Sequence, residues 1–169
     1  MTLKRIIIED PVHIEVSVKI QTLKVWRGHR VKKTYPISTA LKGTGQAKAS
    51  NQTPLGKHVI RAKIGDGLPV NSVFVARRPT GEIYSDELVK SNPNRDWILT
   101  RILWLSGCEK GRNRLGNVDT MQRYIYIHGT PDSEPMGQPL SHGCVRMRNQ
   151  DMLELFDLVS VGTRVNIHL

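Results

Sequence analysis

The stretch from residue 124 to residue 147 limits the possible folds of this 169-residue chain more than any other part of it. It begins with YIYIHGT, whose alternation predicts a strand that buries Ile125 and Ile127 and carries His128 at its tip on the opposite face. Glycine and proline recur in the residues that follow, which favours a folded-back loop because they supply unusual φ values and remove backbone donors. We therefore expect Cys144, 16 positions after His128, to return close to it in space.

The length suits a single domain, residues 1–169, with a core large enough to be stable without disulfide bonds. The chain has two cysteines, Cys108 and Cys144, which fits a reducing compartment. A disulfide between them is the less favoured alternative, because it would consume the thiol that follows the glycine-rich loop.

The N-terminal residues contain three consecutive isoleucines, at positions 6–8, before Glu9 and Asp10. This apolar run is too short for a signal peptide, and no later segment approaches membrane-spanning length. The sequence therefore predicts a cytoplasmic protein with no membrane segment, or a periplasmic one if an export signal has been removed. It leaves the oligomeric state open.

The formal net charge of +10 is concentrated in the first 64 residues. That part holds 13 Lys and Arg residues against 3 acidic residues, whereas the two signs cancel from residue 65 onward. A basic region of this kind can bind a nucleic acid, a membrane or an anionic substrate, or it can be a solvated face of strands. We favour the solvated face or a small anionic ligand and expect no nucleic acid, because no nucleic-acid-binding motif accompanies the charge.

Most of the chain shows the pattern of β-strands. Apolar and polar residues alternate from Val12 to Gln21, which predicts a half-buried strand. A polar, glycine-rich segment at 38–53 predicts a long surface loop that ends in a TPLG turn. Similar patterns predict a hairpin over 23–37 and further strands over 57–64, 70–76, 98–105 and 163–169.

Helical patterns are few. Residues 85–97 can hold one helical turn, and Asn149 is expected to cap a longer helix that ends before Gly162. Many strands with one substantial helix predict a mainly β domain, a β-sandwich or partly open barrel, with that main helix packed on one side near the C-terminus. The apolar stripe of this helix comprises Met152, Leu153, Leu155, Phe156 and Val159.

The central stretch can support nucleophilic chemistry. A cysteine attacks only as thiolate, so a catalytic Cys144 needs a base, and His128 is the available one. If residues 144–148 are extended, Arg146 shares a face with Cys144 and can stabilise the thiolate or bind a substrate carboxylate.

The same loop offers an oxyanion hole beside Ser141. The amides around His142, Gly143 and Cys144 can converge on one oxygen, because Gly143 has no side chain to obstruct its backbone. This arrangement suggests acyl transfer through a thioester. Zinc binding by His128, His142 and Cys144 is a weaker alternative, since a fourth ligand at familiar spacing is missing, and we expect no metal and no organic cofactor.

Two segments carry a family resemblance. HGT at 128–130 followed by SHGCVRM at 141–147 resembles the active-site motif of the YkuD-type L,D-transpeptidases. The similarity extends along nearly the whole chain, through QTL at 21–23, YPIST at 35–39, TPLG at 53–56, NVDT at 117–120 and GTRV at 162–165.

The resemblance implies a β-sandwich-like catalytic domain that acts on peptidoglycan stem peptides. Family members take an acyl group from the third, diamino-acid residue of a tetrapeptide stem and release D-alanine, and the acceptor decides the product. By matching positions, the implied site comprises the nucleophile Cys144, its base His128, Gly129 whose carbonyl orients the imidazole, and the oxyanion or substrate-binding residues Ser141, His142, Gly143 and Arg146.

The acceptor is open at this point. Most relatives carry an export signal, and family members without one resemble cytoplasmic L,D-carboxypeptidases that use water to trim recycled tetrapeptides. An amine acceptor would instead give a cross-link. Two alternatives from other classes are a sortase-like transpeptidase, whose histidine normally lies much further upstream of its cysteine, and a non-catalytic basic module that binds nucleic acid.

Overall fold

The computed structural model describes residues 9–169, so the isoleucines at 6–8, on which the prediction about a signal peptide rests, lie outside the described residues. Within this part of the chain no helix is long and apolar enough to cross a membrane. The described elements are the strands β1 (Val12–Ser17), β2 (Thr22–Arg27), β3 (Arg30–Pro36), β4 (Gly56–Ile64), β5 (Ser72–Val75), β6 (Arg78–Ile83), β7 (Ile98–Gly107), β8 (Tyr126–Thr130), β9 (Val145–Arg148) and β10 (Arg164–His168), the helices α1 (Asp86–Ser91) and α2 (Asn149–Leu158), and the 3-10 helix η1 (Gly116–Val118).

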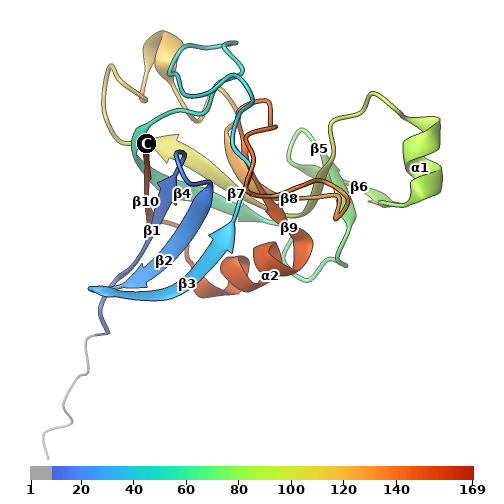
Figure 1. Cartoon of the computed structure of the whole chain (residues 1–169), viewed down its shortest axis with the longest axis horizontal. Coiled ribbons are helices and arrows are strands. Elements are labelled where there is room, and N and C mark those ends of the chain that lie inside the picture. Colours follow the sequence, from blue (N-terminus) through green and yellow to red (C-terminus); the bar gives the residue numbers. More distant parts are fainter. Residues whose placement is uncertain (1–8) are drawn as a thin grey trace, which may run out of the picture.

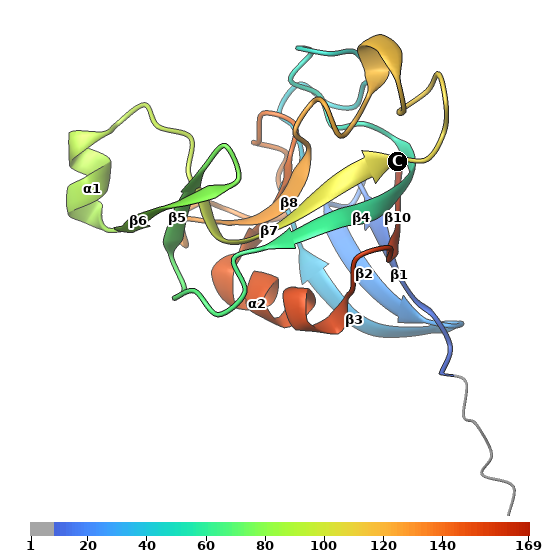
Figure 2. The same ribbon diagram turned by 180° about the vertical axis from the view of Figure 1, so that it is seen from behind.

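All these strands belong to one sheet, which branches at β7. Its main path runs β3-β2-β1-β10-β4-β7-β5-β6, while β8 pairs with β7 and β9. One edge of β7 pairs with β4 and then β5, and the other edge pairs with β8. Figure 1 shows the sheet curling around α2, with β1 to β3 on one side and β7 to β9 above it, and Figure 2 shows from behind that α2 also lies below β4 and β7. The predicted mainly β fold, partly open and with one main helix near the C-terminus, is confirmed.

The first strands follow directly from their alternating pattern. Ile14, Val16, Leu23 and Val25 point inward and are at most 2% exposed, while the polar residues between them face outward. The predicted hairpin is present as β2 and β3, which pair in antiparallel fashion. β1 ends earlier than expected, because the chain turns back at Gln21, whose φ is 51°.

Helix α2 covers the inner face of the sheet. Its buried residues Met152, Leu155 and Phe156 lie within the main core cluster, as the apolar stripe predicts. At the C-terminal end of α2, the carbonyls of Phe156 and Val159 accept hydrogen bonds from Nζ of Lys63 on β4, at 2.6 and 2.7 Å. Lys63 thus provides a partner for carbonyl groups that a helix end leaves unpaired. The helix therefore ties the two halves of the curled sheet together.

Two local predictions were wrong. Residues 38–53 do form a loop, but Ser38 and Thr39 at one end and Thr53 at the other are at most 1% exposed, so the ends of the loop are buried structure. Asn149 does not cap α2: the N-cap position is Arg148, and the Asn149 side chain bonds elsewhere in the interior. Strand β6 had no counterpart among the predicted strands, since most of its residues are exposed and carry no apolar alternation.

Candidate active site

His128 lies on β8, between β7 and β9. Ile125 and Ile127 are buried as predicted, and all five residues of β8 are buried too, His128 included; β7 and β9 pair with its two edges. His128 is 2% exposed, and its Nδ1 lies 2.6 Å from the carbonyl oxygen of Gly129. A carbonyl only accepts hydrogen bonds, so Nδ1 carries the proton and Nε2 keeps a free lone pair. Burial lowers the pKa of His128, which keeps the imidazole neutral at neutral pH.

Gly129 has no room for a side chain. A Cβ at this position would lie 2.5 Å from Asn149 Oδ1 and 2.6 Å from the carbonyl oxygen of Leu99. Asn149 is itself fixed, because it donates to the carbonyl of Thr130 at 2.9 Å and accepts from the hydroxyl of Thr100 at 2.6 Å. This buried network supports the end of the strand that carries His128.

Cys144 directly precedes β9, which runs parallel to β8. The pairing of Val145 with Ile127 places Cys144 beside the first residue of β8, and the amide of Tyr126 donates to Cys144 Sγ at 3.3 Å. Burial raises the pKa of the Cys144 thiol to about 12, although the Tyr126 amide and the Arg146 guanidinium act in the opposite direction. The resting site therefore pairs a protonated thiol with a neutral imidazole.

The turn before Cys144 is fastened from both sides. Gly143 has a φ of 134°, which favours glycine, and its carbonyl accepts from the Thr53 hydroxyl at 2.9 Å. The Ser141 hydroxyl donates to the carbonyl of Cys144 at 2.6 Å and accepts from the amide of Gly143 at 3.2 Å. The Gly143 amide is thus already engaged, contrary to the expectation that it points into an oxyanion hole. The amides of His142 and Cys144 have no acceptor among residues 9–169 and remain available.

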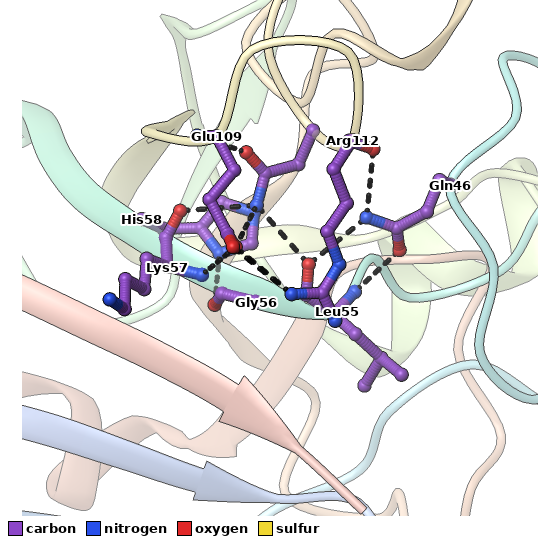
Figure 3. A network of polar contacts seen from close by, with 8 residues as sticks. Gln46, Leu55, Gly56, Lys57, His58, Glu109 and Arg112 are labelled. Carbon is purple, nitrogen blue, oxygen red and sulfur yellow. Dashed lines mark hydrogen bonds and ion pairs between the residues drawn. The ribbon is translucent and has the colours of Figure 1, made fainter.

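Thr53 belongs to the TPLG turn, and a polar network holds that turn in place. Figure 3 shows the Glu109 carboxylate against the start of β4, where its Oε2 accepts from the amide of Lys57 at 2.7 Å. Gln46 brackets Leu55, accepting from its amide at 2.6 Å and donating to its carbonyl at 3.0 Å. A Cβ on Gly56, whose φ is 102°, would lie 2.2 Å from Glu109 Oε2. The network therefore fixes the position of Thr53 and, through it, the turn that presents Cys144.

Arg146 and His142 meet at a carboxylate that the sequence did not indicate. Arg146 Nη2 lies 3.4 Å from one oxygen of Asp96, and His142 Nδ1 lies 3.8 Å from the other. Arg146 is largely buried, whereas the His142 side chain is 69% exposed. Arg148, on the same strand, faces solvent.

The side chains of the site line a cavity of about 400 Å³. His128 and Cys144 both line it, although no direct hydrogen bond joins these two described side chains; catalytic hydrogen bonds often tighten only when substrate is bound. The remaining lining residues are Ala76, Arg77, Asp96, Ile98, Arg123, Tyr124, Ile125, Tyr126, Ser141, His142 and Arg146. The structure thus places all the predicted side chains of the site around one cavity. Gly129 and Gly143 do not line it; their carbonyls contact His128 and Thr53.

Three charged lining residues were missed by sequence reasoning: Arg77, Asp96 and Arg123. They come from the β5–β6 turn, the segment before β7 and the segment before β8, and no local pattern marks them. A second cavity of about 220 Å³ shares Asp96, His142 and Arg146 with the first. Among residues 9–169 no group of three or more His, Cys, Asp or Glu side chains is arranged to hold a metal ion.

The fold and this cysteine–histidine site match one family. Residues 11–167 match the profile of the YkuD L,D-transpeptidase catalytic domain, and the chain belongs to this family. It is 31% identical over 157 residues to the YkuD protein of Bacillus licheniformis and 28% identical over 159 residues to that of Bacillus subtilis, both named as L,D-transpeptidases. The alignments cover 93% and 94% of this chain but 66% of each relative, so the chain spans slightly less than two thirds of their length.

A solved structure has the same fold. L,D-transpeptidase 3 from Mycobacterium tuberculosis, in complex with a faropenem-derived adduct, superposes with a TM-score of 0.55 at 18% identity. The match covers 94% of this chain and 60% of the mycobacterial one. At this identity the similarity concerns the fold alone.

Proposed function

We propose that the chain is a cysteine acyl-enzyme that acts on peptidoglycan tetrapeptide stems and cleaves the L,D bond before the terminal D-alanine. The family supports an activity related to peptidoglycan. The observation that carries the mechanism is that Cys144 and His128 line one cavity while Gly129 fixes the imidazole tautomer. Cys144 is the nucleophile in this proposal, and His128 is its general base.

In the first half-reaction, the Cys144 thiol gives its proton to Nε2 of His128 as Sγ attacks the carbonyl of the diamino acid. The free amides of His142 and Cys144 stabilise the oxyanion of the tetrahedral intermediate. The C–N bond then breaks, and the imidazolium protonates the leaving amine of D-alanine. The products are free D-alanine and a thioester on Cys144.

In the second half-reaction an acceptor replaces the thioester. Water or an amine gives a proton to Nε2 and attacks the acyl carbonyl, the C–S bond breaks, and the proton returns to sulfur. Water yields a tripeptide, as in an L,D-carboxypeptidase, and an amine yields a cross-linked dimer, as in an L,D-transpeptidase. The second cavity beyond Asp96 offers room for either acceptor.

The test is a product assay. The protein is incubated with a tetrapeptide ending in D-alanine, with and without an amine acceptor, and the products are separated by mass. Release of D-alanine that is lost in Cys144→Ala and kept in Cys108→Ser supports the proposal, because Cys108 is the matched exposed cysteine. Activity retained by Cys144→Ala, or no D-alanine from the wild-type protein, contradicts it.

A further inference from the structure

Arg77 occupies an unusual turn beside the cavity. It forms, with Ala76, the two-residue connection of the hairpin in which Val75 pairs with Arg78. Both turn residues have positive φ, 47° at Ala76 and 65° at Arg77. Hairpins of this kind normally place glycine or asparagine there, so keeping alanine and arginine costs free energy. Such strain is common where a side chain must be held in a particular place for function.

From this turn the Arg77 side chain reaches the lining of the cavity. Its guanidinium carbon lies 4.5 Å from the ring centroid of Trp104 and 4.7 Å from that of Tyr124. Nη1 donates to the hydroxyl of Tyr126 at 3.1 Å, and the amide of Tyr126 donates to Cys144 Sγ. Aromatic rings and one hydrogen bond thus hold the cation in the lining of the cavity that also contains Cys144.

The three arginines of the cavity are not equivalent. Arg123 is engaged internally, since it donates to the carbonyls of Gly45 and Gln52 at 3.1 and 2.6 Å and to a serine hydroxyl. Arg146 lies against Asp96. Arg77 donates only to a neutral hydroxyl, and no carboxylate among residues 9–169 lies within 4.0 Å of it.

A guanidinium that lines a site and has no carboxylate partner is suited to binding a planar anion. Its remaining N–H groups can form a forked pair with a carboxylate, and the two aromatic rings that contact the guanidinium reduce the side-chain entropy lost on binding. Asp96, the acidic residue that lines the cavity, lies against Arg146 and His142 and so leaves the positive potential of Arg77 unopposed.

We propose that Arg77 is a specificity-determining residue that binds a free carboxylate on one of the two substrate residues that flank the scissile bond. This inference rests on the proposed function, because the tetrapeptide supplies two such groups: the carboxylate of the terminal D-alanine and the side-chain carboxylate of a diaminopimelate in the third position. Arg77 takes no part in proton transfer, so its loss should affect binding of the substrate more than turnover.

The experiment compares Arg77→Gln and Arg77→Lys with Arg78→Gln, a control on the same hairpin that does not line the cavity. Each is assayed on three tetrapeptides: the parent, one ending in D-alaninamide, and one with lysine in the third position. On the parent, we expect Arg77→Gln to lose about 10- to 100-fold in kcat/KM, mainly through KM, and Arg78→Gln to change less than about twofold. Arg77→Lys should fall between them, because it keeps the charge and loses the fork.

The modified peptides identify the carboxylate. On the peptide that lacks the group bound by Arg77, the wild-type protein should already be slow and Arg77→Gln should add no further loss. The other modified peptide should show the full loss. Equal losses on all three peptides would mean a structural role and overturn the inference, as would no loss on any of them.

A binding measurement separates this inference from the proposed function. In the Cys144→Ala background, Arg77→Gln should weaken binding of the parent tetrapeptide about tenfold or more, and Arg78→Gln should not. Unchanged binding overturns the role of Arg77 even if the wild-type enzyme is active. If the wild-type protein releases no D-alanine from any peptide, the proposed function fails and the inference fails with it.

Discussion

His128 and His142 line the same cavity, but they differ in burial and in how firmly they are held. His128 is 2% exposed, sits on a strand paired on both edges and bonds a carbonyl at 2.6 Å. His142 is 69% exposed in its side chain and makes one loose contact, 3.8 Å, with Asp96. The comparison shows which histidine has a defined tautomer and position. A general base needs both, whereas a group at the rim of the cavity can adjust to the substrate.

The largest expected effect comes from replacing each of the two histidines in turn. His128→Gln should lower kcat/KM for D-alanine release by about 10³-fold, because it removes the base that takes the thiol proton. His142→Gln should cost less than about tenfold, since its backbone amide stays in place. Steady-state kinetics of both variants on the tetrapeptide check this, and comparable losses in the two would remove the distinction between the histidines.

Acid should destabilise the fold through another buried histidine, His58. His58 is 1% exposed, and burial lowers its pKa from 6.5 to about 4. The unfolded chain therefore binds a proton that the folded chain rejects between pH 6.5 and 4. Stability should fall over this window as the pH is lowered, by about 3 kcal/mol for a shift of this size. Urea unfolding at pH 7 and pH 4.5 measures it, with His29→Gln as an exposed control that keeps the full loss and His58→Gln expected to reduce it.

The packing behind His128 gives the next effect. Gly129→Ala places a Cβ 2.5 Å from Asn149 Oδ1, which should destabilise the fold by about 1–3 kcal/mol. It should also lower activity by displacing the carbonyl that orients His128. In Gly137→Ala the added Cβ meets nothing within 4 Å, so any loss there comes from its φ of 83° and not from a close approach. Equal melting temperatures for Gly129→Ala and the wild-type protein would show that this strand end is not tightly packed.

The smallest expected effect is that of Asp96, the carboxylate next to His142 and Arg146, on the reactivity of Cys144. Asp96 raises the pKa of the Cys144 thiol by its negative charge, so Asp96→Asn should lower that pKa and speed alkylation of Cys144 at a given pH. The change should be about two- to threefold, because Asp96 is half-exposed and solvent screens it. Iodoacetamide kinetics between pH 7 and 10, in a Cys108→Ser background, provide the measurement. Slower alkylation would reverse the assigned sign.

The same contrast explains what the sequence could predict. Alternation revealed β1, β2 and β10, and the apolar stripe revealed α2, because burial of one face leaves a periodic pattern. The alternation in YIYIHGT also revealed β8, although it did not indicate that all five residues of this strand are buried. The exposed edge strand β6 has no apolar face to detect.

The candidate site divides in a similar way. His128, Cys144 and their neighbours lie in one continuous stretch with a recognisable motif, so local sequence identified them. Arg77, Asp96 and Arg123 reach the cavity through long-range contacts, which single-sequence patterns do not record. Thr53 is intermediate: the TPLG turn was visible, whereas its bond to the Gly143 carbonyl, 90 residues away, was not.

The most direct measurement is the intact mass of the protein during turnover of the tetrapeptide, followed by peptide mapping. We predict a thioester that adds the tripeptide acyl group to Cys144, absent from Cys144→Ala, unchanged in Cys108→Ser and accumulating more slowly in His128→Gln. An adduct on Cys108, or one that persists in Cys144→Ala, would contradict the proposed nucleophile.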